Sequence, residues 1–223
     1  MCGRFTLTID PAEFKDEFER ADFPAKFSPR FNIAPTQAVL AIPNDNRKAA
    51  DFLIWGLIPS WAKDPTIGHR LINARGETLG EKPAFRGGFK YKRCLILADG
   101  FFEWKTLAGT KTKIPHYIRL KTGKIFAFAG LWDEWQATDG GSVRTCTIVT
   151  TTPNELMASI HNRMPVILPS KDYSEWLDSK PRAPETLTHL IKALPAELME
   201  AYPVSTLVNS PANDRPECIL REK

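Results

Sequence analysis

Residues 93–105 read RCLILADGFFEWK, and this stretch decides the fold class. Two apolar runs, each long enough for a short strand, flank the dipeptide Asp99-Gly100. This dipeptide is typical of a turn between strands. The stretch therefore predicts two short strands that meet at Asp99-Gly100.

Further strand patterns lie on both sides of this stretch. β-branched and apolar residues are concentrated in residues 38–42 (AVLAI), 51–59 (DFLIWGLIP), 145–153 (TCTIVTTTP) and 164–168 (MPVIL). Residues 115–120 and 125–132 are also strand-like, and KTGK at 121–124 is predicted to join them as a hairpin. The middle of the chain is therefore predicted to be mainly β-structure.

Helix signals lie toward the two ends of the chain. Asp10 is predicted to cap a helix that begins at Pro11, with Glu13 at the third position after the cap. The other helical patterns are residues 154–160, residues 170–177 and an apolar stripe of Leu187, Leu190, Ile191 and Leu194. Because no repeat or linker divides the sequence, we predict a single α+β domain over residues 1–223.

The composition is that of an ordinary globular protein. A chain of 223 residues with 43% hydrophobic residues can bury one sizeable core. Its net charge of +4 permits nucleic-acid binding without requiring it. No stretch approaches the length of a membrane span, and the four cysteines lack the spacing of zinc ligands or of a disulfide framework. We therefore expect a protein of the reducing cytoplasm.

The chain begins MCGRF, so Cys2 directly follows the initiator methionine. Removal of Met1 is favoured before a small residue and would leave Cys2 with an amine and a thiol on adjacent carbons. Both groups ionise within about two pH units of neutrality. Such an aminothiol traps an aldehyde, because the amine forms an imine and the thiol then closes a five-membered thiazolidine. The alternative is that Cys2 is simply a small residue after Met1.

Three polar residues stand beside apolar or aromatic neighbours. Glu103, between Phe102 and Trp104, is either a solvent-facing strand residue or a pocket carboxyl with a raised pKa that suits proton transfer. His161 is either an ordinary loop histidine or a proton shuttle. Asn73 is either a turn residue or an amide that holds the Cys2 amine or a sugar hydroxyl.

Cations and one tryptophan lie close to the same segments. The guanidinium groups of Arg4, Arg75 and Arg163 are able to clamp phosphates, or they are scattered surface charges. Trp61 either stacks on a nucleobase or covers the core.

Together these motifs resemble the SOS-response-associated peptidase (SRAP) family, whose members process abasic sites in single-stranded DNA. In chain order they are MCGRF (1–5), FNIAPTQ (31–37), WGLIPSW (55–61), LINARGET (71–78), ADGFFEWK (98–105), IHNRMPVIL (160–168) and PVSTLVN (203–209). The resemblance implies an α+β domain with a central, barrel-like, mostly antiparallel β-sheet flanked by helices.

The resemblance also implies the roles of the site residues. Cys2 would form a thiazolidine with the ring-opened abasic deoxyribose, a covalent crosslink that shields the lesion from strand cleavage. Glu103 would open the sugar ring as an acid/base group, His161 would assist proton transfer, and Asn73 would orient Cys2. The residues implied to contact DNA are Arg4, Trp61, Arg75, Lys82 and Arg163.

Lys82 stands near the place where some relatives carry an arginine, so the strength of DNA binding there is open. The implied partner is single-stranded DNA with abasic sites, bound by a monomer in the DNA damage response. No metal, organic cofactor, membrane or obligate protein partner is implied, and the nucleoid is the expected place of action. An autopeptidase activity that removes Met1 is a further expectation.

Two other functional classes stay open. Glutamine amidotransferase domains also begin with Met-Cys-Gly, but the present chain contains no Asn-Gly and no Gly-Asp dipeptide of the kind such hydrolases use. A non-covalent reader of modified or single-stranded DNA would tolerate Cys2→Ala. Cys94, Cys146 and Cys218 lie in apolar runs and are expected to be buried and inert.

Overall fold

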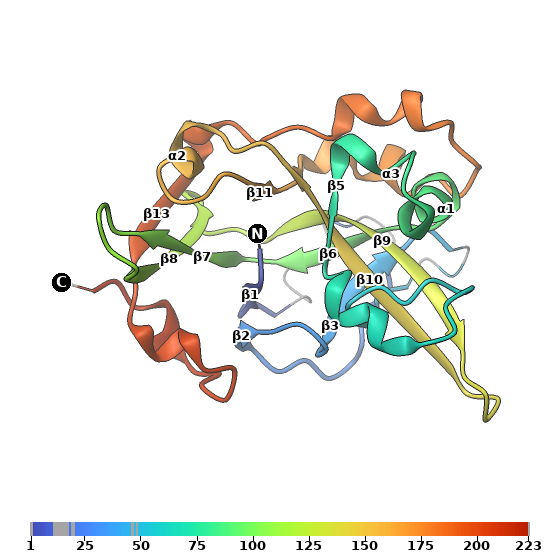
Figure 1. The fold of residues 1–223 in the computed structure, drawn as a ribbon, viewed down its shortest axis with the longest axis horizontal. Helices are drawn as coiled ribbons and strands as arrows, with labels where there is room; N and C mark the ends of the chain where they lie inside the picture. Colours follow the sequence, from blue (N-terminus) through green and yellow to red (C-terminus); the bar gives the residue numbers. More distant parts are fainter. Residues whose placement is uncertain (1, 11–17, 19–20, 46, 48, 223) are drawn as a thin grey trace.

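A computed structural model describes residues 2–10, 18, 21–45, 47 and 49–222 (Figure 1). The helix predicted to begin at Pro11 lies outside these residues. In the described part, two β-sheets are the main elements, and the helices are short.

Five strands close into a barrel. They are β3 (Ala38–Pro43), β4 (Asp51–Trp55), β6 (Arg93–Ala98), β9 (Phe126–Gln136) and β10 (Ser142–Thr151). β10 pairs in parallel with β4, and antiparallel pairs then run from β4 through β3, β6 and β9 back to β10. All six residues of β6 and the first seven of β9 are buried, which explains why their sequences are nearly continuous apolar runs.

A second sheet packs against this barrel. Its strands are β1 (Arg4–Leu7), β2 (Arg30–Ile33), β7 (Gly100–Thr106), β8 (Lys113–Leu120) and β13 (Met199–Pro203). They are antiparallel, in the order β13-β8-β7-β1-β2. Phe102 and Tyr117 lie in a small apolar cluster on one side of this sheet, whereas Phe5 and Phe101 belong to the main core. β7 is therefore covered on both faces.

The two sheets meet through aromatic side chains. The ring centroid of Phe5 in β1 lies 5.1 Å from that of Trp55 in β4 and 5.7 Å from that of Phe128 in β9. Phe101 in β7 lies 6.0 Å from Phe128. All four side chains are fully buried. This packing fixes β1 at the junction between the barrel and the second sheet.

Short elements complete the structure. Three small strands, β5 (Asn73–Arg75), β11 (Met164–Pro165) and β12 (Ile167–Leu168), extend the barrel sheet by pairing with β10, β10 and β9. The α-helices are α1 (Pro83–Tyr91), α2 (Glu155–Ala158) and α3 (Tyr173–Trp176). One-turn or slightly longer 3₁₀ helices are Pro65–Arg70, Gly76–Thr78, Ser170–Asp172, Pro184–Thr186, Thr188–Leu190, Ala196–Leu198, Thr206–Asn209 and Pro216–Ile219. No helix in the described residues is long and apolar enough to cross a membrane.

Asp99 marks the point where the chain passes from the barrel to the second sheet. β6 ends at Ala98 and β7 begins at Gly100, as the sequence predicts, but the two strands belong to different sheets. Gly100 is required there, because a Cβ atom would lie 2.1 Å from Tyr117 Oη. The hairpin predicted across residues 121–124 is wrong for the same topological reason, since β8 and β9 also lie in different sheets.

The C-terminal amphipathic helix is also a wrong prediction. The stretch contains only the 3₁₀ helices Pro184–Thr186 and Thr188–Leu190. Leu187, Leu190 and Leu194 are nevertheless buried in the main core. Their spacing therefore reflects separate contacts with the core and not the face of a continuous helix. The barrel-like, mostly antiparallel sheet with flanking helices is confirmed.

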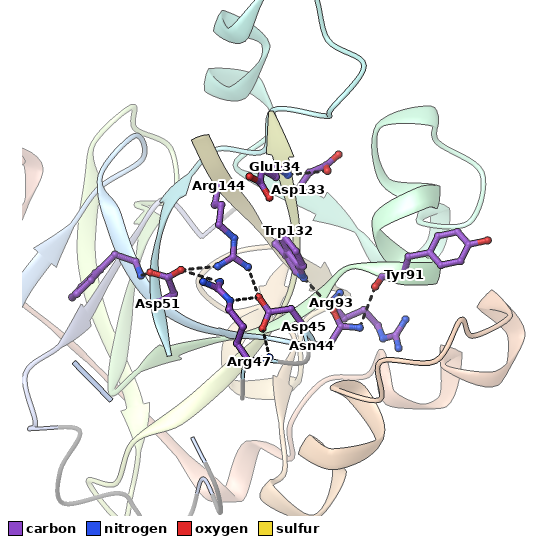
Figure 2. A network of polar contacts seen from close by, with 11 residues as sticks. Asn44, Asp45, Arg47, Asp51, Tyr91, Arg93, Trp132, Asp133, Glu134 and Arg144 are labelled. Atoms are coloured by element: carbon purple, nitrogen blue, oxygen red, sulfur yellow. Dashed lines mark hydrogen bonds and ion pairs between the residues drawn. The ribbon is translucent and has the colours of Figure 1, made fainter. Parts of the chain in front are cut away.

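A polar network lies along the barrel wall (Figure 2). Arg144 Nη1 and Nη2 donate hydrogen bonds to Asp51 and Asp45 at 2.6 and 2.8 Å. Its guanidinium carbon lies 4.4 Å from the ring centroid of Trp132, whose Nε1 donates to Asn44 Oδ1 at 3.1 Å. These contacts join β4, β9 and β10 with the segment that directly follows β3.

Among the described residues, Arg93 is the largest charged side chain that is fully buried. Its guanidinium donates to backbone carbonyl oxygens at the ends of α1 and α3. The acceptors are Phe89 at 3.0 Å, Lys90 at 2.9 Å, Trp176 at 2.8 Å and Asp178. Since the last carbonyls of a helix have no intrahelical partner, Arg93 satisfies two helix ends at once.

Candidate active site around Cys2

β1 is anchored by the carboxylate of Asp99. Asp99 Oδ2 accepts hydrogen bonds from the Thr8 amide and hydroxyl, both at 2.6 Å, and Oδ1 accepts from the Thr6 hydroxyl at 2.5 Å. Tyr117 Oη lies 2.9 Å from the same Thr6 hydroxyl. Burial raises the pKa of Tyr117, so this phenol stays protonated and serves as a donor. These bonds fix the register of the strand that follows Cys2.

Cys2 is fully buried and lies two residues before β1 begins. Its backbone carbonyl accepts a hydrogen bond of 2.8 Å from Asn73 Nδ2, and its Sγ lies 3.8 Å from the carbonyl oxygen of Arg4. Burial raises the pKa of the thiol, and the nearby Glu103 carboxylate raises it further. The sulfur is therefore a neutral thiol near pH 7 and needs a base when it reacts.

Asn73 reaches Cys2 from a distant part of the sequence. It begins β5, which pairs in parallel with β10 so that Asn73 is opposite Ile148. While its nitrogen holds Cys2, its Oδ1 is buried and accepts no hydrogen bond from the described residues. The amide thus keeps one acceptor for a group that enters the site.

Glu103 is buried in β7, with 2% of its surface exposed. The pairing of Arg4 with Phe102 puts Glu103 level with Gly3, one residue from Cys2. Burial raises the pKa of Glu103, although His161 opposes this shift. The alternative of a solvent-facing strand residue is therefore excluded, and the carboxyl holds its proton to higher pH than an exposed glutamate does.

His161 follows α2 and lies half-buried near Glu103. The Asn154 side chain caps α2 by accepting from the Met157 amide at 2.9 Å, and the His161 amide donates to Met157 O at 2.8 Å. His161 Nδ1 accepts from the Arg163 amide at 3.0 Å. With Nδ1 used as an acceptor, the proton of the neutral ring lies on Nε2.

The Arg163 side chain is bonded within the protein. Its Nη1 and Nη2 donate to the two carboxylate oxygens of Glu77 at 2.6 and 2.8 Å, and Nη2 also donates to the Thr150 carbonyl at 2.8 Å. The hydrogen bond from Arg163 lowers the pKa of Glu77. A phosphate contact from Arg163 stays a prediction and has to compete with these bonds.

Arg4 is also bonded within the protein, on the other face of β1. It donates to Asn32 Oδ1 at 2.9 Å and to the carbonyls of Val208 and Asn209 at 2.7 and 3.2 Å. Trp104, next to Glu103, donates to Asn209 Oδ1 at 2.8 Å. The C-terminal segment thus fastens β1 and β7 together, and a DNA contact from Arg4 stays a prediction.

The other residues predicted to contact DNA are exposed. Arg75 lies two residues after Asn73 in β5. Trp61 is 58% exposed, which excludes a role as a cover of the core. It lines a pocket of about 160 Å³ together with Pro83 and Tyr91. Lys82 directly precedes Pro83, at the start of α1.

The structure therefore brings Cys2, Asn73, Glu103 and His161 close together. Their catalytic roles stay predictions. Two further polar contacts next to this group have no signal in the sequence. Asp99, which the sequence predicts only as a turn residue, anchors β1, and Glu77, for which the sequence predicts no role, binds Arg163. Neither contact can be predicted without the pairing of the strands. Among the described residues, no three His, Cys, Asp or Glu side chains are grouped as metal ligands.

Known proteins are similar to this chain over nearly its whole length. Residues 1–211 match the family model described as SOS response associated peptidase (SRAP). The abasic site processing protein YoqW of Bacillus subtilis (strain 168) is 50% identical over 222 residues, which are 98% of this chain and 99% of that protein. The abasic site processing protein HMCES of Gallus gallus is 32% identical, covering 99% of this chain and 77% of that protein.

The fold gives the same assignment. A crystal structure of a protein from Bacteroides thetaiotaomicron superposes with a TM-score of 0.87 at 29% identity, over 100% of both chains. With a family match that includes every residue of the Cys2 site and relatives of this length and identity, the chain belongs to the SOS response associated peptidase family.

Proposed function

We propose that this protein captures abasic sites in single-stranded DNA as a thiazolidine on Cys2. The single observation that carries the proposal is the position of Cys2, whose carbonyl is held by Asn73 beside the buried carboxyl of Glu103. Relatives named abasic site processing proteins support the choice of substrate. Removal of Met1 is a precondition, because the reaction needs the α-amine of Cys2.

The reaction begins with opening of the sugar ring. Protonated Glu103 gives its proton to O4′ as the C1′–O4′ bond breaks, and His161 accepts the proton of the C1′ hydroxyl, which leaves an aldehyde. The raised pKa of Glu103 suits this step, since the carboxyl must still carry a proton near neutrality.

Ring closure on the protein follows. The Cys2 amine attacks C1′, and the loss of one water gives an imine. The thiol then adds to the imine carbon, and its proton passes through the Glu103 carboxylate to the nitrogen. The product has lost the imine that promotes strand cleavage by β-elimination, so the crosslink protects the lesion.

In this proposal the main contacts with DNA are made by residues that are exposed. Arg75 and Lys82 neutralise phosphates on either side of the lesion, and Trp61 stacks on an unpaired base. Arg4 and Arg163 take part where a phosphate competes with their present partners. Binding by a monomer through such contacts weakens as the salt concentration rises.

The test is a crosslinking assay with an abasic single-stranded oligonucleotide. Wild-type protein is expected to give a band that resists denaturation, with an intact mass equal to protein plus oligonucleotide minus one water. Cys2→Ala is expected to abolish it, whereas Cys218→Ala, which removes a buried thiol of the small cluster, keeps it. DNA without abasic sites gives no band.

Two results would contradict the proposal. A crosslink that persists in Cys2→Ala would assign the bond to another nucleophile. Hydrolysis of glutamine or of a peptide by wild-type protein, without any crosslink, would favour an N-terminal-nucleophile hydrolase.

A further inference from the structure

We infer that Glu77 is a positioning residue for His161, acting through Arg163. The contribution to crosslinking rests on the proposed function, whereas the effect on the histidine is a property of the protein alone. The Glu77 carboxylate bonds the side chain of Arg163, and the backbone of Arg163 contacts the imidazole of His161, which lies near Glu103.

The first link is the ion pair between Glu77 and Arg163. Both carboxylate oxygens of Glu77 accept from the terminal nitrogens of Arg163, a two-bond geometry that fixes the plane of the guanidinium. The Arg163 side chain is only 14% exposed, and Glu77 is the one carboxylate that contacts it within the described residues. Thr150 adds a bond from its carbonyl on the inner side.

The second link is between residue 163 and the histidine ring. His161 Nδ1 lies 3.0 Å from the Arg163 amide nitrogen and 3.3 Å from the Arg163 carbonyl oxygen. A ring that carries its proton on Nε2 accepts from the amide, whereas a ring that carries it on Nδ1 donates to the carbonyl. The orientation of the Arg163 backbone therefore selects the tautomer.

The third link explains why Glu77 matters for this choice. Arg163 Nε is already buried without a hydrogen bond to any described residue, so without Glu77 the guanidinium would keep Thr150 alone. A buried cation that loses its carboxylate moves toward solvent. Because the side chain then no longer fixes residue 163, both tautomers of His161 become accessible.

Glu77 is expected to support the position of His161 but to oppose the binding of DNA. Its negative charge lies among residues predicted to meet phosphates, and it occupies both terminal nitrogens of Arg163. Removal of Glu77 therefore favours reversible binding of DNA while it disturbs the histidine. A residue that only supports folding would not separate these two effects.

The experiment compares Glu77→Ala and Glu77→Gln with Glu81→Ala. Glu81 is an exposed acid of the same loop, so it controls for the loss of charge. Imidazole ¹H–¹⁵N correlation spectra without DNA, assigned with His161→Asn, are expected to give the Nε2–H tautomer in wild type and Glu81→Ala. Glu77→Ala is expected to give a tautomer mixture, and Glu77→Gln, which keeps one acceptor oxygen, an intermediate spectrum.

The second measurement is the crosslinking rate at saturating abasic oligonucleotide. Glu77→Ala is expected to lower this rate by roughly ten-fold or more, as misplacement of a catalytic group does. Its Kd for intact single-stranded DNA is expected to stay equal or to fall. Arg163→Lys, which loses the two-bond geometry, gives the same spectral change and covers the case in which Glu77→Ala does not fold.

Each outcome decides the inference. A wild-type His161 spectrum in Glu77→Ala or Arg163→Lys overturns it, and so does a mixed spectrum with an unchanged crosslinking rate. If wild-type protein forms no crosslink at all, the proposed function fails, and the spectra alone decide whether Glu77 positions His161.

Discussion

A carboxyl group buried as deeply as that of Glu103 costs the folded protein stability whenever it ionises. Burial raises its pKa above the value in the unfolded chain. The stability it contributes is therefore complete below the unfolded-chain pKa and is lost as the pH rises through the higher folded-state value. In the proposed reaction the same shift keeps a proton available for ring opening.

We expect Glu103→Gln to be more stable than wild type at neutral pH, since glutamine does not titrate. The difference in Tm is expected to be small near about pH 4, where both side chains are neutral, and to grow toward about pH 8. Thermal unfolding across this pH range measures the difference in Tm.

The same Glu103→Gln variant is expected to crosslink about 10²-fold more slowly with little change in DNA affinity. A Tm difference independent of pH, or an unchanged rate, would contradict the acid/base role.

The alternation of polar and apolar residues along 100–106 does not show whether Glu103 is exposed or buried, and the reason is physical. A strand with one wet face separates polar from apolar residues, but β7 is covered on both faces. Phe102 faces the small cluster and Glu103 faces the junction with the barrel. Only the partners of β7, which come from remote parts of the chain, make the difference between a surface glutamate and a buried one.

At the scale of elements, Arg93 connects β6 to two helix ends. Its guanidinium is buried, and burial lowers its pKa, yet it makes its hydrogen bonds to carbonyl oxygens and not to a carboxylate. The carbonyl oxygens at the ends of α1 and α3 accept these bonds, and the charge of the Asp178 carboxylate favours the cation. This arrangement holds both helices on the barrel.

We expect Arg93→Met to lower the free energy of unfolding by about 3–5 kcal/mol, because several buried carbonyls lose their donors together. Urea denaturation measures the change. Arg86→Met, on the exposed side of α1, is the matched control and is expected to change it by no more than about 0.5 kcal/mol. Equal stability of the two variants would show that water satisfies these carbonyls.

The positions of the strands could be predicted from the sequence more easily than their pairing into sheets. The runs at β3, β4, β6 and β10 are visible as apolar and β-branched segments, and Asp99-Gly100 does separate two strands. Turn residues report only the local path of the chain, however. They do not reveal that β6 and β7, or β8 and β9, enter different sheets. The same limitation made three separately buried leucines look like one helix face.

For the whole molecule, a single domain over residues 1–223 stays a prediction. Phe5 and Phe101 carry the second sheet into the core of the barrel, so neither sheet keeps its packing without the other. The family resemblance rests on seven short motifs. The contacts between those motifs, such as Asn73 with Cys2, depend on strand pairings that the motifs do not contain.

We therefore expect one cooperative unfolding transition. Far-UV circular dichroism follows both sheets, and the fluorescence of a Trp104→Phe variant follows the five other tryptophans, none of which lies in a strand of the second sheet. The two signals are expected to give the same midpoint. Two separate midpoints would mean that the barrel and the second sheet unfold independently.

The parallel pairing of β5 with β10 has a consequence for synthesis on the ribosome. Asn73 docks opposite Ile148, and His161 comes later still, so Cys2 leaves the ribosome long before its neighbours in the site exist. At ordinary translation rates this interval is on the order of ten seconds. A nascent chain therefore carries Cys2 apart from Asn73 and His161 until most of the polypeptide has been made.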